Sequence, residues 1–222
     1  ILHCQALFEL SEPVVRRSGA PVLIVPNVLE PELCRTLIDY WQSGEKVADR
    51  VASGQGNERA HAPAKRRIDV PISDKVLFET VKMRLAKRVV PELKRAFCFN
   101  VASFEALRIG CYDSTAGGYF KRHRDNATPF TAHRSFAMSL NLNTGAYEGG
   151  QVVFAEFGRE RYEAEAGGAV IFSCNLLHEA LPVTRGRRFA VFTFFADAAG
   201  AALERQTMER ERAAGRQGVS LR

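Results

Sequence analysis

A change in hydrophobic period near Phe104 does most to limit the folds open to this chain. From there on, apolar residues occupy every second position, as at Phe136, Met138, Leu140 and Leu142. Such alternation is typical of strands that bury one face. Further apolar runs follow at 152–154, 169–172 and 189–195, with glycine pairs at 149–150 and 167–168 between them. Short strands at regular spacing with glycine turns predict a sandwich or jelly roll.

The first hundred residues show helical spacing instead. One helix is expected to begin at Pro31 and to end at Gly44. A second is capped by Asp74 and interrupted by Pro91. Its buried face is expected to carry Val76, Leu77, Val81 and Leu85. Strands are expected at 21–25, 66–70 and 104–112.

These patterns predict a mainly β fold of the α+β class. We expect a double-stranded β-helix, a cupin-like jelly roll, with N-terminal helices packed on one sheet. Residues 1–197 are expected to form a single domain, with helical support at about 1–100 and the jelly-roll core at about 104–197. Residues 198–222 are predicted to form a charged C-terminal helix or tail. At 222 residues and 46% hydrophobic, the chain can bury a core.

The charge and cysteine content bear on the partners and the location of the protein. The net charge of +6 comes mostly from scattered basic residues, with clusters only at 65–67 and 185–188. This favours a solvated surface over a nucleic-acid or acidic partner. Five cysteines without a Cys-x-x-Cys motif predict free thiols in a reducing compartment, and therefore a cytoplasmic location. No apolar run reaches the ~20 residues of a membrane span, so no membrane partner is expected.

A polar, glycine-rich segment spans 46–65 and contains His61. A disordered loop and a mobile lid over a binding site explain it equally well. We expect His61 to be solvated rather than to bind a ligand.

Three residues have the types and spacing of a metal site. His123 and Asp125 are two positions apart, so on an extended chain both side chains point to the same side. His178, after the apolar run at 169–172, is the candidate for a third ligand. Two histidines and one carboxylate on one face of a metal are the arrangement of non-haem Fe(II) oxygenases.

An arginine pair follows the third candidate ligand. Gly186-Arg187-Arg188-Phe189 opens the last apolar run, which would return as a strand beside the metal. The guanidinium of one of these arginines could then bind a carboxylate through two parallel hydrogen bonds. Because side chains alternate along a strand, only one of the two arginines can face inward.

Taken together, these motifs resemble the Fe(II)/2-oxoglutarate dioxygenases. The resemblance is strongest to the prolyl 4-hydroxylase branch, which includes the oxygen-sensing prolyl hydroxylases, and it covers about 104–197. It is carried by Tyr112, Gly117-Gly118-Tyr119, His123-Arg-Asp125-Asn126, Leu142-Asn143, Gly149-Gly150, His178, Pro182-Val183 and Gly186-x-Arg188-Phe189. It implies an enzyme that uses Fe(II), 2-oxoglutarate and O2, with ascorbate as a candidate reductant, to hydroxylate an aliphatic carbon and release succinate and CO2.

The resemblance also implies roles for individual residues. Arg188 matches the position that pairs with the distal carboxylate of 2-oxoglutarate, and Tyr112 matches a tyrosine that contacts this cosubstrate, although a packed strand tyrosine explains it nearly as well. A tyrosine common before Leu-Asn in the family is Asn141 here. Asn141 and Asn126 are candidates for residues that contact and orient the binding residues without binding the metal themselves. No catalytic residue is expected beyond the metal centre.

The substrate is left open by the sequence. The resemblance suggests a prolyl residue in a peptide or protein, and a free amino acid or small metabolite is the alternative. The arginines that nucleic-acid demethylases carry after the last histidine are Thr184 and Ala190 here, which disfavours a nucleic-acid substrate. A zinc hydrolase with the same three ligands is a rival, but no His-Glu-x-x-His motif is present. A non-catalytic jelly-roll binding module is the last alternative.

Overall fold

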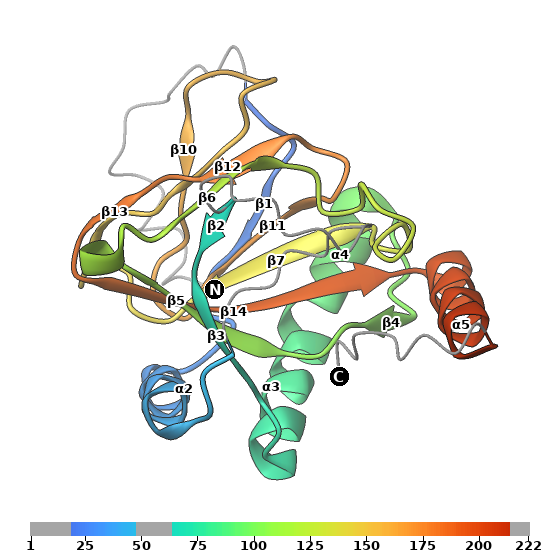
Figure 1. The fold of residues 1–222 in the computed structure, drawn as a ribbon, viewed down its shortest axis with the longest axis horizontal. Helices are drawn as coiled ribbons and strands as arrows, with labels where there is room; N and C mark the ends of the chain where they lie inside the picture. The colour runs from blue at the N-terminus through green and yellow to red at the C-terminus, as the bar shows by residue number, and fades with distance from the viewer. Residues whose placement is uncertain (1–18, 48–63, 214–222) are drawn as a thin grey trace, which may run out of the picture.

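In the computed structural model, residues 19–47 and 64–213 are described. Two antiparallel sheets face each other, with most helices outside the larger one (Figure 1). The expected double-stranded β-helix with helices on one sheet is confirmed. The glycine-rich stretch of the candidate lid, His61 and the chain beyond 213 lie outside the described residues.

The larger sheet has seven strands and forms the floor of the molecule. Its order is β1-β11-β7-β14-β5-β3, and β4 pairs with the end of β14. The strands are β1 (Leu23–Val25), β3 (Ile68–Pro71), β4 (Ser103–Phe104), β5 (Arg108–Asp113), β7 (Phe136–Asn141), β11 (Ala169–Ser173) and β14 (Arg187–Ala196). The long central strand β14 pairs with both β5 and β7.

The smaller sheet lies across from β7 and β14 in Figure 1. Its order is β10-β9-β12-β6-β2. The strands are β2 (Lys65–Arg66), β6 (Tyr119–His123), β9 (Val152–Val153), β10 (Arg161–Tyr162) and β12 (His178–Ala180). A two-stranded ribbon, β8 (Glu148–Gly149) with β13 (Val183–Arg185), joins the sheets at one end, near the 3-10 turn η1 (Ser114–Ala116).

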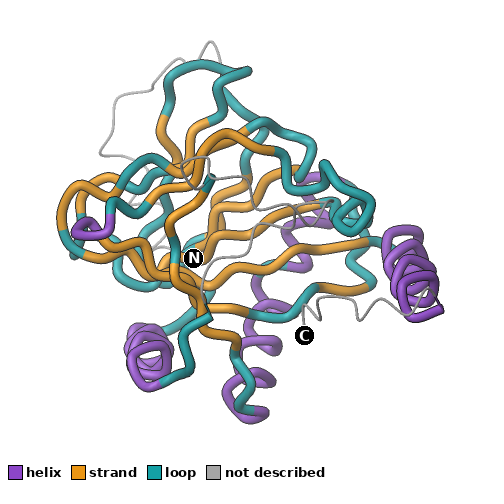
Figure 2. Tube along the Cα trace, in the orientation of Figure 1, coloured by secondary structure: helices purple, strands orange, loops and turns teal. Residues whose placement is uncertain are grey.

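Three helices cover the outer face of the larger sheet, and a fourth follows β14 (Figure 2). They are α2 (Pro31–Ser43), α3 (Lys75–Arg88), α4 (Val90–Phe97) and α5 (Ala198–Ala213). The expected boundaries hold, since Pro31 begins α2, Gly44 follows its last residue, and Pro91 lies in the first turn of α4. The Asp74 carboxylate accepts a hydrogen bond from the Leu77 amide at 2.7 Å and caps α3.

The main hydrophobic core lies between these helices and the sheet. Leu37 of α2, Leu85 of α3 and Leu93 of α4 meet Ile109 and Val191 of the strands, and all five are fully buried. The opposite face of the sheet is therefore free to turn polar side chains toward the smaller sheet.

One prediction for α3 was wrong. Val76 was placed on the buried face, but it is 77% exposed, whereas Val81 is completely buried and Leu77 is half-buried. The residues of α3 that pack on the main core are Leu77, Phe78, Val81 and Leu85. The buried stripe therefore begins in the first turn, and Val76 lies beside it on the exposed face.

This difference gives a matched pair of variants on one helix. Val81→Ala should lower the free energy of unfolding by about 2 kcal/mol, because it removes buried methyl groups and leaves a cavity. Val76→Ala should change it by less than about 0.5 kcal/mol, since alanine also favours the helix. Urea unfolding measures both. Equal effects would mean that α3 packs on a different face.

Two expected strands are each divided in the structure. The strand expected at 66–70 breaks at Arg67, because β2 pairs with β6 in the smaller sheet while β3 pairs with β5 in the larger one. The strand expected at 104–112 breaks at 105–107, where the Glu105 side chain joins a buried charged cluster. The alternation of apolar residues in the sequence indicates neither of these two breaks.

Candidate metal and cosubstrate site

His123, Asp125 and His178 converge from two strands of the smaller sheet. His123 ends β6 and His178 begins β12, and the two residues are directly paired. Asp125 lies in the turn after β6 and not on the strand. The two side chains therefore converge for a different reason than the expected alternation along one extended chain. One ligand atom from each of the three residues lies within 4.8 Å of the others. The three predicted residues are therefore brought together.

The hydrogen bonds of the histidines leave the right atoms available for a metal. His123 Nδ1 donates to the Lys121 carbonyl at 2.7 Å, and His178 Nδ1 donates to the Leu176 carbonyl at 2.9 Å. Both bonds fix the tautomer that leaves Nε2 as an acceptor. His123 Nε2 lies 3.2 Å and His178 Nε2 lies 3.3 Å from the oxygens of Asp125.

This arrangement fits a cation. His123 Nε2 is buried without a hydrogen-bond partner, and it faces carboxylate oxygens that are acceptors too. Ligand bonds of about 2.1 Å at right angles would separate two donor atoms by about 3 Å, close to the distances observed. A divalent ion between these acceptors satisfies all of them at once.

The electrostatics keep the ligands in their metal-binding forms. Burial alone would raise the pKa of Asp125, but His178 and His123 outweigh it and hold the pKa below its usual value. Burial lowers the pKa of His178, although the Asp125 charge opposes this. A metal needs an ionised carboxylate and neutral imidazoles, and both shifts favour that state.

Arg188 lies on the face of the larger sheet that is turned toward the metal residues, which we call the inner face. Its guanidinium donates to Ser139 Oγ at 2.7 Å and to Asn141 Oδ1 at 2.8 Å. The side chain is 2% exposed, whereas Arg187 points to solvent, which confirms that only one of the two faces inward. Arg188 Nε is buried without a partner, as expected of a donor awaiting an anion.

Sequence reasoning missed Tyr147, which stands beside Arg188. Its hydroxyl donates to Glu163 Oε1 at 2.7 Å and accepts from Asn141 Nδ2 at 3.3 Å. Burial raises the pKa of Tyr147, while the Arg188 charge opposes the shift. Asn141 therefore holds both Arg188 and Tyr147 in place, in keeping with its expected supporting role. The only sequence signal was a tyrosine just before the glycine pair.

The glycine pair makes room for Arg188. Gly150 has φ +75°, and a Cβ added there would lie 2.9 Å from Arg188 Cδ and 3.0 Å from Val183 Cγ2. A side chain at this position would push against the arginine as well as strain the backbone.

Tyr112 is buried on β5, directly opposite Arg188 on β14. The Arg188 guanidinium lies 5.5 Å from the centre of its ring. Its hydroxyl accepts a hydrogen bond from Arg67 Nη1 at 3.4 Å. Tyr112 is thus placed beside the expected cosubstrate position, with Arg67 as a partner that the sequence did not indicate.

Asn126 supports Asp125 differently from the expectation. Its amide nitrogen donates to Asn175 Oδ1 at 2.8 Å and to the Arg134 carbonyl at 3.5 Å. Arg134 in turn donates from Nη1 to the backbone carbonyl of Asp125 at 3.3 Å. The turn that carries the aspartate is therefore held through its backbone.

Arg134 is anchored by a buried charged cluster around Glu105. The Glu105 carboxylate accepts from Arg134 Nη2 at 2.9 Å and lies 3.0 Å from His133 Nε2. Burial would raise the pKa of Glu105, but His133 and Arg134 outweigh it and lower the pKa. His133 has a structural role in this cluster.

Glu105→Gln should destabilise the protein by about 3 kcal/mol at neutral pH, because it leaves a buried guanidinium without its charge partner. The folded pKa of Glu105 lies below its unfolded value, so its contribution is present above the unfolded pKa and is lost as pH falls through the folded one. The stability gap between variant and wild type should therefore narrow below about pH 4. Urea titrations across pH measure it. The exposed Glu79→Gln, which loses a surface ion pair with Lys82, is the control, with less than about 0.5 kcal/mol expected.

Comparisons with known proteins give the family. The model of the 2OG-Fe(II) oxygenase superfamily matches residues 107–196, which include all three metal-site residues. A PKHD-type hydroxylase of Gluconobacter oxydans is 30% identical over 184 residues, covering 77% of this chain and 76% of the relative. The chain belongs to the 2OG-Fe(II) oxygenase superfamily. A PKHD-type hydroxylase of Methylobacterium nodulans is 29% identical, with 76% and 74% covered.

Solved structures agree with the fold of this oxygenase. A prolyl hydroxylase from Trichoplax adhaerens, in complex with a hypoxia inducible factor peptide fragment, matches with a TM-score of 0.63 at 17% identity, covering 83% of this chain and 87% of its own. The viral collagen prolyl hydroxylase from Paramecium Bursaria Chlorella virus-1 matches with a TM-score of 0.59 at 16% identity, covering 80% and 96%. The oxygenase thus uses Fe(II) and 2-oxoglutarate, with O2, as the resemblance implied.

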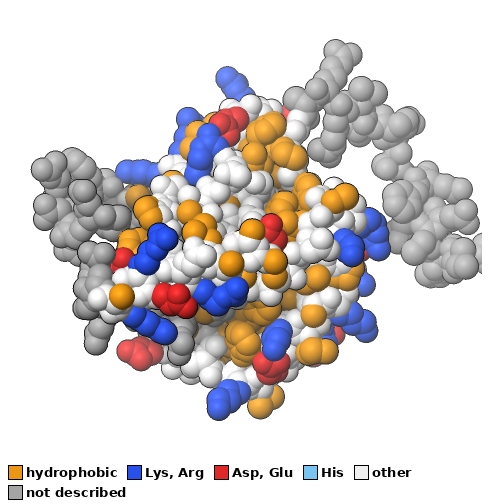
Figure 3. All heavy atoms as spheres, turned by 90° about the vertical axis from the view of Figure 1, so that its right-hand side faces the viewer, with side chains coloured by type: hydrophobic (Ala, Val, Ile, Leu, Met, Phe, Trp, Pro, Cys, Tyr) orange, Lys and Arg blue, Asp and Glu red, His pale blue; other side chains and the backbone are white. Residues whose placement is uncertain are grey.

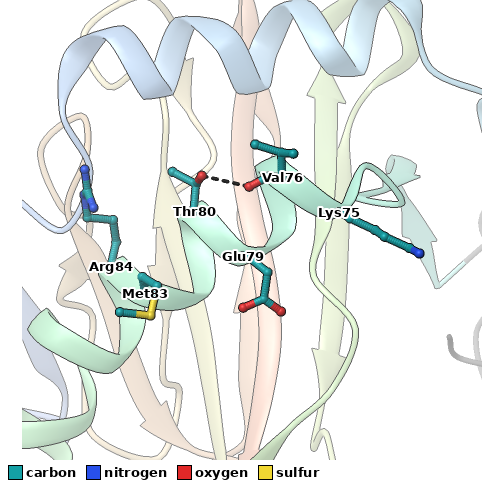
Figure 4. A pocket seen from close by; sticks show the side chains of 6 residues that line it. All are labelled: Lys75, Val76, Glu79, Thr80, Met83 and Arg84. Carbon is teal, nitrogen blue, oxygen red and sulfur yellow. Dashed lines mark hydrogen bonds between the residues drawn. The ribbon is translucent and has the colours of Figure 1, made fainter.

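One hollow in the outer surface of the oxygenase lies away from the candidate site. This hollow, on the solvent side of α3, is lined by that helix alone, and it contains none of the expected site residues (Figure 4). On the face shown in Figure 3, lysines and arginines are spread among acidic and apolar side chains. No helix in the described part of the chain has the length and hydropathy that crossing a membrane requires.

Proposed function

We propose that His123, Asp125 and His178 hold the Fe(II) of this oxygenase and that Arg188 binds the distal carboxylate of 2-oxoglutarate. Among the described residues, three buried side-chain atoms have no hydrogen-bond partner, and two of them, His123 Nε2 and Arg188 Nε, carry the proposal. One awaits a cation and the other an anion, and both face the space between the two sheets. Fe(II) with bound 2-oxoglutarate and O2 supplies oxidative decarboxylation to succinate and CO2, coupled to hydroxylation of a substrate carbon.

The residues around these atoms prepare the site for that chemistry. Ser139 and Asn141 fix the direction of the Arg188 guanidinium. Tyr112, Tyr147 and Val183 pack together beside it and exclude water from the charge pair. A carboxylate bound in such a dry pocket interacts more strongly than it would in solvent. Phe120 stacks on the His123 ring at 3.5 Å and holds the ligand from its outer side.

We propose a prolyl residue of a peptide or protein as the substrate, with a free amino acid or small metabolite as the second candidate. The support is the similarity to prolyl hydroxylases in fold, since the matching structures include a prolyl hydroxylase in complex with a peptide fragment. The inner face also offers half-buried aromatic side chains, Phe192 and Phe194, against which an apolar ring can pack.

The experiment is incubation with Fe(II), 2-oxoglutarate and either mixed proline-containing peptides or free amino acids, followed by mass spectrometry. The expected product has gained one oxygen atom at proline, with an equal amount of succinate released. Oxygen gain only on free amino acids would shift the substrate to the second candidate. Oxygen gain at a residue other than proline would contradict the prolyl proposal while leaving the oxygenase chemistry intact.

A further inference from the structure

The inner face of the larger sheet carries more positive than negative charge. Among the described residues of this face, the ionised side chains are Arg67, Arg108, Arg134, Arg188, Asp69 and Glu105. Four guanidinium groups thus share two carboxylates. Lys65 adds a further positive charge at 3.8 Å from Asp69. Buried charges of one sign are costly unless a counter-charge arrives.

2-Oxoglutarate would balance only part of this excess positive charge. One carboxylate of 2-oxoglutarate pairs with Arg188, and the other, with Asp125, balances the two charges of Fe(II). Arg67 is paired with Asp69 through two bonds of 2.6 and 2.7 Å. Arg134 is paired with Glu105. Arg108 is the cation that these pairings leave over.

Arg108 itself is held weakly. Within the described residues its guanidinium makes no hydrogen bond, and its nearest carboxylate is that of Glu105 at 3.9 Å, which Arg134 and His133 already occupy. Its side chain is 21% exposed, so it is reachable from the space between the sheets. Burial lowers the pKa of Arg108, and repulsion from Arg67 adds to this. An incoming anion would relieve both effects.

The surroundings of Arg108 on the inner face are aromatic. Arg108 and Tyr112 are four positions apart on β5, so their side chains lie on the same face of the sheet. Arg108 is paired across the sheet with Phe192 of β14. Arg67 lies 4.0 Å from the Phe192 ring, and Arg134 lies 3.8 Å from the Phe194 ring. Phe192 and Phe194 therefore lie on the same strand between Arg108 and Arg134, and Arg134 contacts the turn that carries Asp125.

We propose that Arg108 binds a carboxylate of the substrate, so that this oxygenase selects an acceptor with an acidic group a few bonds from the reacting carbon. The inference rests on the proposed function, because it places the reacting carbon at the metal and the apolar part on Phe192 and Phe194. The carboxylate belongs either to an Asp or Glu next to the target residue or to a free amino acid.

The test uses two arms with Fe(II) and 2-oxoglutarate present. The first is a pool of peptides with blocked ends, in which randomised residues flank a central proline. The second compares free amino acids with their amides. Products that have gained an oxygen atom are sequenced or identified by mass spectrometry. In one arm, carboxylates should be preferred over the matching amides by about 10-fold or more.

Variants assign that preference to its residue. Arg108→Gln should abolish it, and Arg108→Lys should restore part of it, since the charge returns without the fork. The exposed Arg95→Gln on α4 removes the same charge away from the inner face and should leave the preference intact. Equal use of acids and amides by wild type, or a preference that survives in Arg108→Gln, would overturn the inference while leaving the proposed function standing. Succinate release without an oxygenated product in either arm would contradict the inference and both proposed substrates, while leaving the metal and cosubstrate assignment standing.

Discussion

His178→Ala should lose Fe(II), with an apparent affinity at least 100-fold below that of wild type, because loss of a direct ligand exceeds the 10–100-fold effects of residues that only support ligands. His123→Ala and Asp125→Ala should behave alike, since each supplies one of the three converging atoms. The measurement is anaerobic titration of metal-free protein with Fe(II). Metal found after aerobic purification is a poorer guide, because affinity alone does not select iron.

His133→Ala is the matched control for this series. It also removes a buried imidazole, but one that lies against Glu105 and not against the metal residues. It should reduce stability and keep stoichiometric Fe(II). If His133→Ala lost iron and His178→Ala kept it, the ligand set would be wrong.

Arg188→Ala should weaken the apparent affinity for 2-oxoglutarate by about 30-fold or more, because losing one partner of a buried charge pair costs roughly 2–5 kcal/mol. Fe(II) binding should survive, since Arg188 is not a ligand. The affinity of Arg188→Lys should fall between those of wild type and Arg188→Ala. Lysine keeps the charge but loses the two-pronged contact with a carboxylate and the bonds from Nη2 to Ser139 and Asn141. Succinate release against 2-oxoglutarate concentration measures all three proteins.

Arg187→Ala serves as the neighbouring control. Arg187 is exposed at the start of β14, so its loss should change the 2-oxoglutarate affinity by less than about threefold. An Arg188→Ala variant with wild-type affinity would remove the main support for the cosubstrate position. Damage from Arg187→Ala alone would place the cosubstrate on the other face of β14.

Much of the site could be predicted from local patterns in the sequence. The alternation in β14 required one arginine inside and one outside, and Arg188 is the one buried. His123 and His178 meet because β6 and β12 are neighbours in the smaller sheet, where the two residues are directly paired. Capping residues and prolines fixed α2, α3 and α4 to within one or two residues.

What the sequence did not indicate depends on contacts between distant segments. Tyr147 meets Asn141 only after the turn before the glycine pair folds back on β7. Arg67 reaches Tyr112 because the chain crosses from one sheet to the other at that residue. The break after β4 follows from Glu105, whose partners lie almost thirty positions away in the chain. No periodicity encodes such pairings.

The most direct test of the account is succinate formation from 2-oxoglutarate by metal-free wild-type protein reconstituted with Fe(II), with Zn(II) or with no metal. The predicted result is conversion with Fe(II) alone, and none by His178→Ala under the same conditions. Zn(II) fits two histidines and a carboxylate equally well, so it should bind and compete without supporting turnover. Conversion that proceeds without iron, or that His178→Ala retains, would contradict the assignment of this site as the Fe(II) centre.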